Sequence, residues 1–266
     1  EALTGGKVSF SARARYESVE QDNDLKDADA FTVRSTLGYE TGRLNGFGAF
    51  LEFENVTDLG GDNYNSTTNG ETEYSVVADP DGTEVNQAYL SYQGFDTVAK
   101  FGRQQITYRD APFHRYIGNV LWRQNHQTFD AFSIQNTSLP DTRLSYAFVN
   151  KINTIFGDDR DAGIIRNSVI DVEAHLLNAQ YSGLPFGKLE GYGYLLEYED
   201  AEATSSKTLG VRLSGAPAIN DAWNLVYTAE YARQSDYKSG TMDAQDYYLA
   251  ELGAKHKGRM AKLSYE

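Results

Sequence analysis

One stretch of this sequence, residues 106–126, combines apolar and basic side chains in a way that a solvated loop does not. It carries the apolar and aromatic residues Phe113, Tyr116, Ile117, Val120, Leu121 and Trp122, and the arginines Arg109, Arg115 and Arg123. Guanidinium groups hold anions, and apolar side chains need a surface to pack on. We therefore expect this stretch to fold inward onto the wall of its own structure and to narrow a passage there. The alternative is an external loop packed on its neighbours.

Residues that could carry out covalent chemistry are few. The four histidines, His114, His126, His175 and His256, show no metal-ligand spacing. No motif places a serine beside His175, and the glycines do not form a phosphate-binding loop. The sequence therefore predicts no enzyme, no cofactor and no metal site.

The elements on either side of the arginine-bearing stretch alternate in polarity with a period of two. In the first of them, apolar residues at 8, 10, 12, 14 and 16 alternate with polar residues at 7, 9, 11, 13, 15 and 17. Because side chains alternate across a strand, each such segment has one apolar and one polar face. About thirteen segments of this kind predict strands near residues 7–17, 31–40, 47–54, 84–92, 97–104, 128–135, 143–149, 175–181, 189–198, 208–214, 223–233, 245–255 and 260–266. We expect residues 1–266 to form one all-β domain, an antiparallel up-and-down transmembrane β-barrel.

The predicted connections run alternately short and long. Short turns follow the even-numbered strands, as at 41–46 and 93–96, and long polar loops such as 57–83 follow the odd-numbered ones. Bacterial barrels have short periplasmic turns, which places the N-terminus at the periplasmic side. Aromatic residues of the apolar face are expected at both strand ends, as interfacial girdles. They are Tyr39, Phe47, Tyr92, Tyr181 and Trp223 beside short turns, and Tyr16, Phe31, Phe53, Phe148, Tyr198, Tyr231 and Tyr248 beside long loops.

Composition agrees with a barrel and argues against other classes. The mean hydropathy is −0.54, as expected when only alternate residues face lipid. No stretch approaches the ~18–20 apolar residues of a transmembrane helix. The net charge of −14 argues against a nucleic-acid partner, and the absence of cysteine fits an oxidising envelope. Many acidic residues fall in predicted loops, where they are either simply solvated or bridged by divalent cations to lipopolysaccharide.

Charged residues of the polar face would line the lumen. Those expected there are Lys7, Arg13, Arg15, Arg34, Lys100, Arg143, Arg212 and Lys262, and Glu17, Glu40, Glu52, Glu54, Glu197, Glu230 and Glu251. Arginines in mid-strand and glutamates nearer the ends would give a basic constriction with acidic mouths. The predicted pore-lining set is Arg13, Arg15, Arg34, Arg103, Arg109, Arg115, Arg123, Arg143, Arg212, Glu52, Glu54 and Glu230. The alternative is that these charges pair across strands and satisfy one another.

Several motifs in the central part of the chain resemble a known family. GRQ at 102–104, GNVLWRQN at 118–125 and QTFDA at 127–131, after EVNQAYL at 84–90, resemble the alginate-export-type outer-membrane barrels of Gram-negative bacteria. This resemblance implies a monomeric barrel of about sixteen to eighteen strands. Members range from exporters of an anionic polysaccharide to general porins.

Two features of the end of the chain lead to a further expectation. The predicted strand number is odd, whereas single-chain bacterial barrels close with an even number, and the alternation is still running at Glu266. We therefore expect further strands to follow, unless a strand has been miscounted.

The predicted function is that of a porin-like channel in the bacterial outer membrane, in contact with lipid and lipopolysaccharide. It would pass small hydrophilic solutes, anions among the candidates, by passive diffusion. The alternatives are an exporter of an anionic, alginate-like polysaccharide, a non-conducting adhesin or structural barrel, and a barrel hydrolase.

Overall fold

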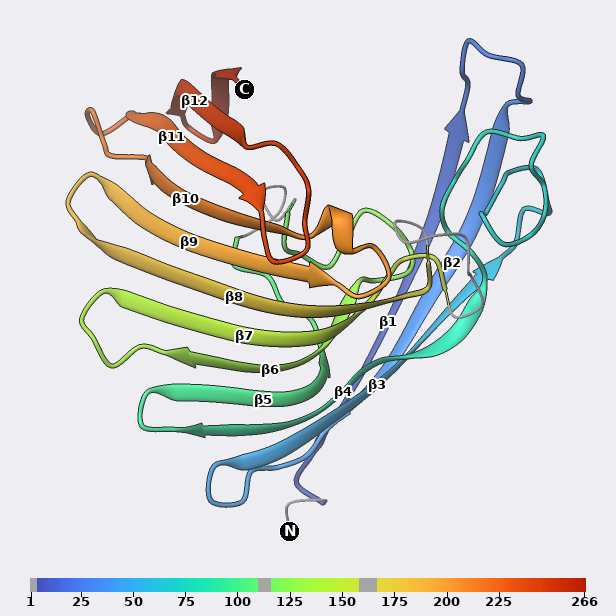
Figure 1. Ribbon diagram of the computed structural model, residues 1–266, viewed down its shortest axis with the longest axis horizontal. Coiled ribbons are helices and arrows are strands. Elements are labelled where there is room, and N and C mark those ends of the chain that lie inside the picture. The colour runs from blue at the N-terminus through green and yellow to red at the C-terminus, as the bar shows by residue number, and fades with distance from the viewer. Residues whose placement is uncertain (1–3, 110–115, 158–166) are drawn as a thin grey trace. The chain divides into compact units, whose positions relative to one another are not determined.

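The computed structural model describes residues 4–109, 116–157 and 167–266. In these ranges the chain forms thirteen strands, hydrogen-bonded in chain order with antiparallel neighbours (Figure 1). They are β1 (Lys7–Val19), β2 (Ala28–Glu40), β3 (Phe47–Asp58), β4 (Gly82–Gly94), β5 (Thr97–Gln104), β6 (Thr128–Asn136), β7 (Thr142–Asn153), β8 (Val169–Leu184), β9 (Gly187–Tyr198), β10 (Ser206–Gly215), β11 (Trp223–Asp236), β12 (Gln245–His256) and β13 (Arg259–Tyr265). The predicted all-β fold and its strands are confirmed, although β8 begins earlier than expected. A 3₁₀ turn, η1 (Glu202–Thr204), precedes β10.

Short turns follow the even-numbered strands, as the sequence predicts. The β4–β5 turn has positive φ at Phe95 (51°) and Asp96 (53°), and the β12–β13 turn has positive φ at Lys257 (44°) and Gly258 (83°). Positive φ at both central residues is the signature of a type I′ turn, whose twist matches that of the flanking strands. Local turn chemistry therefore fixes the register of these hairpins.

The chain divides into two compact units, which are described one at a time. Unit 1 comprises Glu1–Tyr92, Lys100–Phe132 and Asn150–Asp171, and unit 2 comprises Gln93–Ala99, Ser133–Val149 and Val172–Glu266.

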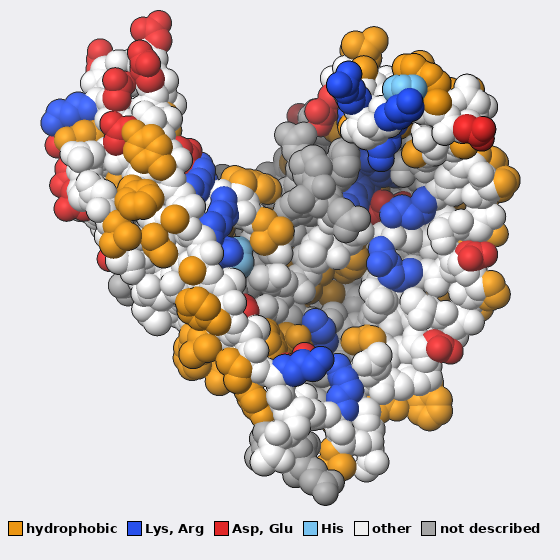
Figure 2. Space-filling view, turned by 180° about the vertical axis from the view of Figure 1, so that it is seen from behind, with side chains coloured by type: hydrophobic (Ala, Val, Ile, Leu, Met, Phe, Trp, Pro, Cys, Tyr) orange, Lys and Arg blue, Asp and Glu red, His pale blue; other side chains and the backbone are white. Residues whose placement is uncertain are grey.

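The strands of unit 1 have one exposed apolar face and one polar face. In the β1–β2 pair, Val8 lies opposite Tyr39, Phe10 opposite Leu37 and Tyr16 opposite Phe31. These apolar side chains include several of the most exposed large hydrophobic residues of the chain, as expected for a lipid-facing surface. Figure 2 shows apolar side chains covering one side of this unit, with Lys and Arg side chains gathered along its edge.

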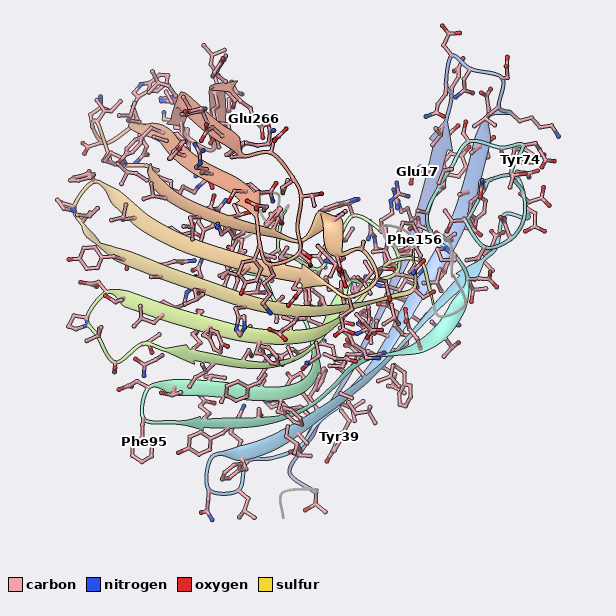
Figure 3. The ribbon with its side chains drawn as sticks, in the orientation of Figure 1. Glu17, Tyr39, Tyr74, Phe95, Phe156 and Glu266 are labelled. Carbon is pink, nitrogen blue, oxygen red and sulfur yellow. The ribbon has the colours of Figure 1, made fainter. Side chains whose placement is uncertain are left out.

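The long β3–β4 loop of unit 1 has a small core of its own. Tyr64 and Val77 are buried against Ala28 and Ala30 at the start of β2, and Val19 at the end of β1 packs against the same cluster. Tyr39 lies at the other end of β2, next to the short turn, whereas Tyr74 lies in the long loop (Figure 3). The apolar cluster explains how a loop of mostly polar residues holds a defined conformation.

Unit 2 repeats the division into two faces. Tyr231 and Tyr248 face one another across β11 and β12, with ring centroids 5.1 Å apart, and both are exposed. On the opposite face, Glu190, Arg212 and Glu230 are buried. Because large apolar side chains are exposed while charged ones are buried, this part of unit 2 has the polarity of a membrane-spanning sheet rather than that of a soluble domain.

Candidate functional site

Two arginines face one another at the centre of the polar face of unit 1. Arg13 of β1 lies directly opposite Arg34 of β2 in the strand register. Like charges in directly opposed positions repel and destabilise a strand pair. Each of these guanidinium groups therefore needs a partner from another element, and both find it in the stretch between β5 and β6.

Arg13 binds the backbone of that stretch. Its Nη1 donates to the carbonyl oxygens of Leu121 (2.8 Å) and Arg123 (3.0 Å), and its Nη2 lies 3.5 Å from the carbonyl oxygen of Trp122. We call residues 116–127 the anchored segment, because further contacts hold it to the same face. Three consecutive carbonyl groups directed at one guanidinium fix the path of this segment over β1.

Buried amide side chains continue the attachment. Gln124 is fully buried, and its Nε2 donates to the carbonyl oxygen of Thr32 (3.0 Å) and to its hydroxyl (2.9 Å). The Nδ2 of Asn125 donates to the carbonyl oxygen of Pro80 in the β3–β4 loop (2.9 Å). A buried amide bonded to a strand backbone is costly to expose, so these contacts hold the segment in one register.

Arg34 and Glu54 meet the ring of His126 from two sides. His126 Nδ1 lies 3.0 Å from Glu54 Oε2, and the backbone N–H of His126 donates to Glu54 Oε1 (3.0 Å). The other ring nitrogen, Nε2, contacts Arg34 Nη1. Because a guanidinium can only donate, Nε2 acts as the acceptor and the proton belongs on Nδ1, towards the carboxylate.

A second carboxylate, Asp79 of the β3–β4 loop, joins the anchored segment to β1. Asp79 accepts hydrogen bonds from the backbone N–H of Gln124 and from Arg15 Nη1, both at 2.8 Å, and lies 3.7 Å from Arg123. Glu17, labelled in Figure 3, pairs with Arg15 and with Arg123 (3.3 Å). Burial raises the pKa of Asp79 and outweighs the opposing influence of the Gln124 N–H and the two arginines.

An irregularity between β3 and β4 adds two amides to the site. The register shifts between Glu52 and Phe53, so that Glu52 faces Gln87 while Phe53 faces Val85, and Asn86 is the additional residue. Asn86 Nδ2 (2.8 Å) and Gln87 Nε2 (3.0 Å) both donate to Glu52 Oε1. Neighbouring residues of a regular strand point to opposite faces, so this shared partner depends on the bulge.

The polar face of unit 2 carries a buried ion pair. Arg212 and Glu230 lie opposite one another in the β10–β11 register, with Nη1 and Oε2 2.6 Å apart. Tyr192 of β9 donates its hydroxyl to the other oxygen of Glu230 (2.7 Å). Lys262 of β13, which lies opposite Gly253, pairs diagonally with Glu251 of β12. Cross-strand pairing, the alternative to an open charged lining, therefore accounts for several of the predicted charges.

Other cations of the polar faces have neutral hydrogen-bond partners. In unit 2, Arg143 Nη2 and Lys188 Nζ (3.3 Å) both bind the side-chain oxygen of Gln180. In unit 1, the hydrogen bonds that Arg13 makes within the described residues go to carbonyl oxygens. A neutral hydrogen-bond partner adds no negative charge of its own, so these three side chains keep the capacity to attract an anion, although Asp79 also acts on the charge of Arg13.

The predicted site residues fall into several groups. Arg13, Arg15, Arg34, Arg123 and Glu54 come together around the anchored segment, with Glu52 next to them; Arg143, Arg212 and Glu230 lie on the polar face of unit 2. Arg103, at the end of β5, pairs with Asp130 of β6 (2.9 Å) and donates to the carbonyl oxygen of Val85. Arg109 lies at the edge of the described ranges, where its carbonyl oxygen accepts from Thr107. Arg115 lies outside the described residues, as do residues 110–115 of the predicted constriction stretch.

The expectation that Glu197 faces the lumen is wrong. Along β9, Glu190 points to the buried polar face, and Glu197 lies an odd number of positions away and so on the opposite face. Glu197 lies opposite Glu173 of β8, and Lys238 of the β11–β12 loop binds both carboxylates. The pKa of Lys238 is raised by its hydrogen bonds to Glu173 and Glu197. The same alternation places Tyr198 on the polar face, so this residue does not belong to the aromatic girdle.

Two general features complete the site. Within residues 4–109, 116–157 and 167–266, no group of three or more His, Cys, Asp or Glu side chains could hold a metal ion. No helix in the described part of the chain is long and apolar enough to cross a membrane.

Comparison with known proteins gives no match by family model and none among curated proteins. Solved structures do match. The chain is similar to Pseudomonas aeruginosa OccD3 (OpdP), with a TM-score of 0.71, 14% identity and 99% of this chain covered. It is also similar to Acinetobacter baumannii OccAB3 (TM-score 0.74, 13% identity, 99% covered) and to Pseudomonas aeruginosa OpdK, solved with vanillate (TM-score 0.69, 15% identity, 99% covered).

The chain has the fold of an outer-membrane porin. It spans 57% of the length of OccD3 and 67% of the lengths of OccAB3 and OpdK. All three are solved structures of the Occ and Opd type. They do not support the narrower resemblance to alginate-export-type barrels, since the solved proteins that the chain resembles are of the Occ and Opd type. The short motifs at 84–131 are thus compatible with a porin fold without pointing to an exporter.

Proposed function

We propose that the protein is an outer-membrane channel through which small hydrophilic solutes diffuse passively, with a preference for anions, and that the anchored segment forms part of its constriction. The observation that carries this proposal is the attachment of residues 121–126 to the polar faces of β1, β2 and β3. In a porin fold the polar faces of the strands line the lumen, so a segment bound to them would reduce its cross-section.

The charge distribution supports a preference for anions. Arg13, Arg143 and Lys188 bind neutral oxygen atoms, whereas Glu17, Glu54, Glu230 and Glu251 are paired with cations, and Glu52 accepts from the amides of Asn86 and Gln87. A lumen with unpaired positive charge attracts anions and repels cations. OpdK, one of the similar structures, was solved with vanillate, an aromatic carboxylate, which is consistent with such a preference.

The same proposal gives the chain an orientation and surroundings. The short turns would lie at the periplasmic side together with the N-terminus, and the longer loops would face outward. The exposed apolar face, rimmed by Tyr16, Tyr39, Phe47 and Trp223, would contact lipid and the inner part of the lipopolysaccharide layer. A non-conducting adhesin or an exporter has no specific observation in its favour.

Recording currents through the complete protein in planar bilayers tests the proposal. We expect conductance that increases in steps. In a potassium chloride gradient, the reversal potential should lie closer to the equilibrium potential of chloride than to that of potassium. A protein that inserts and carries no current would be a structural barrel or an adhesin, and potassium selectivity would refute the preference for anions.

A pair of variants locates the charge that is responsible. Changing Arg143 and Lys188 together to glutamine should reduce the chloride preference, because both uncompensated charges of β7 and β9 are lost. Arg233→Gln is the matched control, since Arg233 lies on the apolar face of β11, where it pairs with Asp246. Equal effects of the double variant and the control would contradict the assignment of these cations to the lumen.

A further inference from the structure

The β3–β4 loop contributes one buried carboxylate to the polar face of unit 1. Asp79 is only 1% exposed, although the loop around it is rich in polar residues. Its Oδ1 accepts the backbone N–H of Gln124 and its Oδ2 accepts Arg15 Nη1, both at 2.8 Å. Arg123 Nη1 is 3.7 Å from the same Oδ2. One carboxylate thus touches β1 and two residues of the anchored segment.

The loop holds Asp79 firmly in this place. Tyr64 donates its hydroxyl to the carbonyl oxygen of Asp79, and Asn125 binds the carbonyl oxygen of the next residue, Pro80. Tyr64 itself is packed in the cluster with Val77. Because the backbone is fixed on both sides of Asp79, its carboxylate stays in place and can position Arg15, Arg123 and Gln124.

The carboxylate also balances charge. Arg15 and Arg123 are bound by two carboxylates, Glu17 and Asp79, so that the four side chains sum to zero. Without Asp79 the group would carry one positive charge, at the place where the anchored segment crosses β1. A unit charge beside a permeation path acts directly on the choice between anions and cations.

We propose that Asp79 is a positioning residue and a determinant of charge selectivity: it fixes Gln124 and Arg123 of the anchored segment and reduces the anion preference of the passage beside them. This inference rests on the proposed channel function. It assigns to the loop a part in permeation that its polar composition does not suggest.

Asp79→Asn separates charge from shape. Asparagine keeps an acceptor for the Gln124 N–H and has nearly the same volume, so the segment should stay in place while one negative charge is lost. The ratio of anion to cation permeability should rise by about fivefold, the effect of one unit charge at roughly 4 Å in water. Asp81→Asn removes the same charge from an exposed position of the same loop and is the matched control. If both variants give the same reversal potential, Asp79 has no particular role in selectivity.

Asp79→Ala and hydrogen exchange test the positioning role without requiring a current. Alanine removes the acceptor as well as the charge, so the amide of Gln124 should exchange at least tenfold faster than in the wild type or in Asp79→Asn. Unchanged exchange at Gln124 would overturn the positioning role. A protein without any conductance would refute the proposed function and with it the selectivity role, whereas exchange at Gln124 would still decide whether Asp79 holds the segment.

Discussion

Replacing Arg13 with methionine is expected to loosen the anchored segment from β1. Methionine keeps an apolar stem but has no donor for the carbonyl groups of Leu121 and Arg123, which Arg13 binds at 2.8 and 3.0 Å. The third contact, to the carbonyl of Trp122 at 3.5 Å, is too long to add much. The segment should still reach its place, because Gln124, Asp79 and Glu54 contacts remain, but it should open more often.

The size of the effect follows from the two short hydrogen bonds. A hydrogen bond to a charged group contributes about 1.5–3 kcal/mol, and the lower value applies here because the guanidinium is partly in contact with solvent. The loss is then about 3 kcal/mol, which raises the fraction of opened segment by about a hundredfold.

Native-state hydrogen exchange measures this fraction. Where closing is faster than exchange, the rate of an amide is proportional to its opening equilibrium, so the amides of Gln124 and His126 should exchange about a hundredfold faster in Arg13→Met. Amides in the middle of β1 should keep their protection, which excludes a general loss of stability. Lys7→Met, an exposed charge on the same strand and face, is the control and should have no effect. Unchanged exchange at Gln124 and His126 in Arg13→Met would refute the reasoning.

Two further predictions concern buried carboxylates. Glu230→Gln leaves Arg212 charged in a buried position and should lower the free energy of unfolding by about 3 kcal/mol. The variant should therefore unfold at a lower temperature than the wild type in detergent, and equal unfolding temperatures would contradict this prediction. In bilayers, the wild type and Asp79→Asn should differ in reversal potential at neutral pH and become equal as the pH falls, because a protonated Asp79 carries no charge. Since the pKa of Asp79 is raised, the two should become equal at a pH above the usual titration range of aspartate. The sign for stability is the same: the folded state binds this proton more tightly than the unfolded chain, so the contribution of Asp79 to the free energy of unfolding falls as the pH rises through that range. A difference that persists down to about pH 4 would show that Asp79 titrates like an ordinary carboxyl or not at all.

The strands could be predicted because their signal is local and repeated. A period of two over several residues identifies a strand in a two-faced sheet, and the turn residues fix where it ends. The same alternation predicts the wrong faces when it is counted from a residue whose own face is wrongly predicted. The sequence alone predicts the wrong faces for Glu197 and Tyr198, because the burial of Glu190, which decides the alternation of β9, is visible only in the structure.

The site could be predicted only where the strands themselves supply it. Arg13, Arg15 and Arg34 follow from alternation, and Arg123 stands out as a charge among apolar residues of a connection. Asp79 could not be found in this way, because its burial depends on how a long loop packs and on the distant segment that covers it. The apolar residues Tyr64 and Val77 within that polar loop were the available sign that part of it is buried.

The bulge that directs both Asn86 and Gln87 at Glu52 also bears on how related sequences should be compared. An additional residue within a regular strand would exchange the faces of every residue beyond it, and lipid-facing positions would become polar. A bulge confines this change to one position, so that Val85 and Ala88 on either side can keep their apolar role. Between two chains of this fold, a one-residue gap inside β4 is therefore tolerable, and an alignment that forbids gaps within strands would pair lumen residues with lipid-facing ones from this point on.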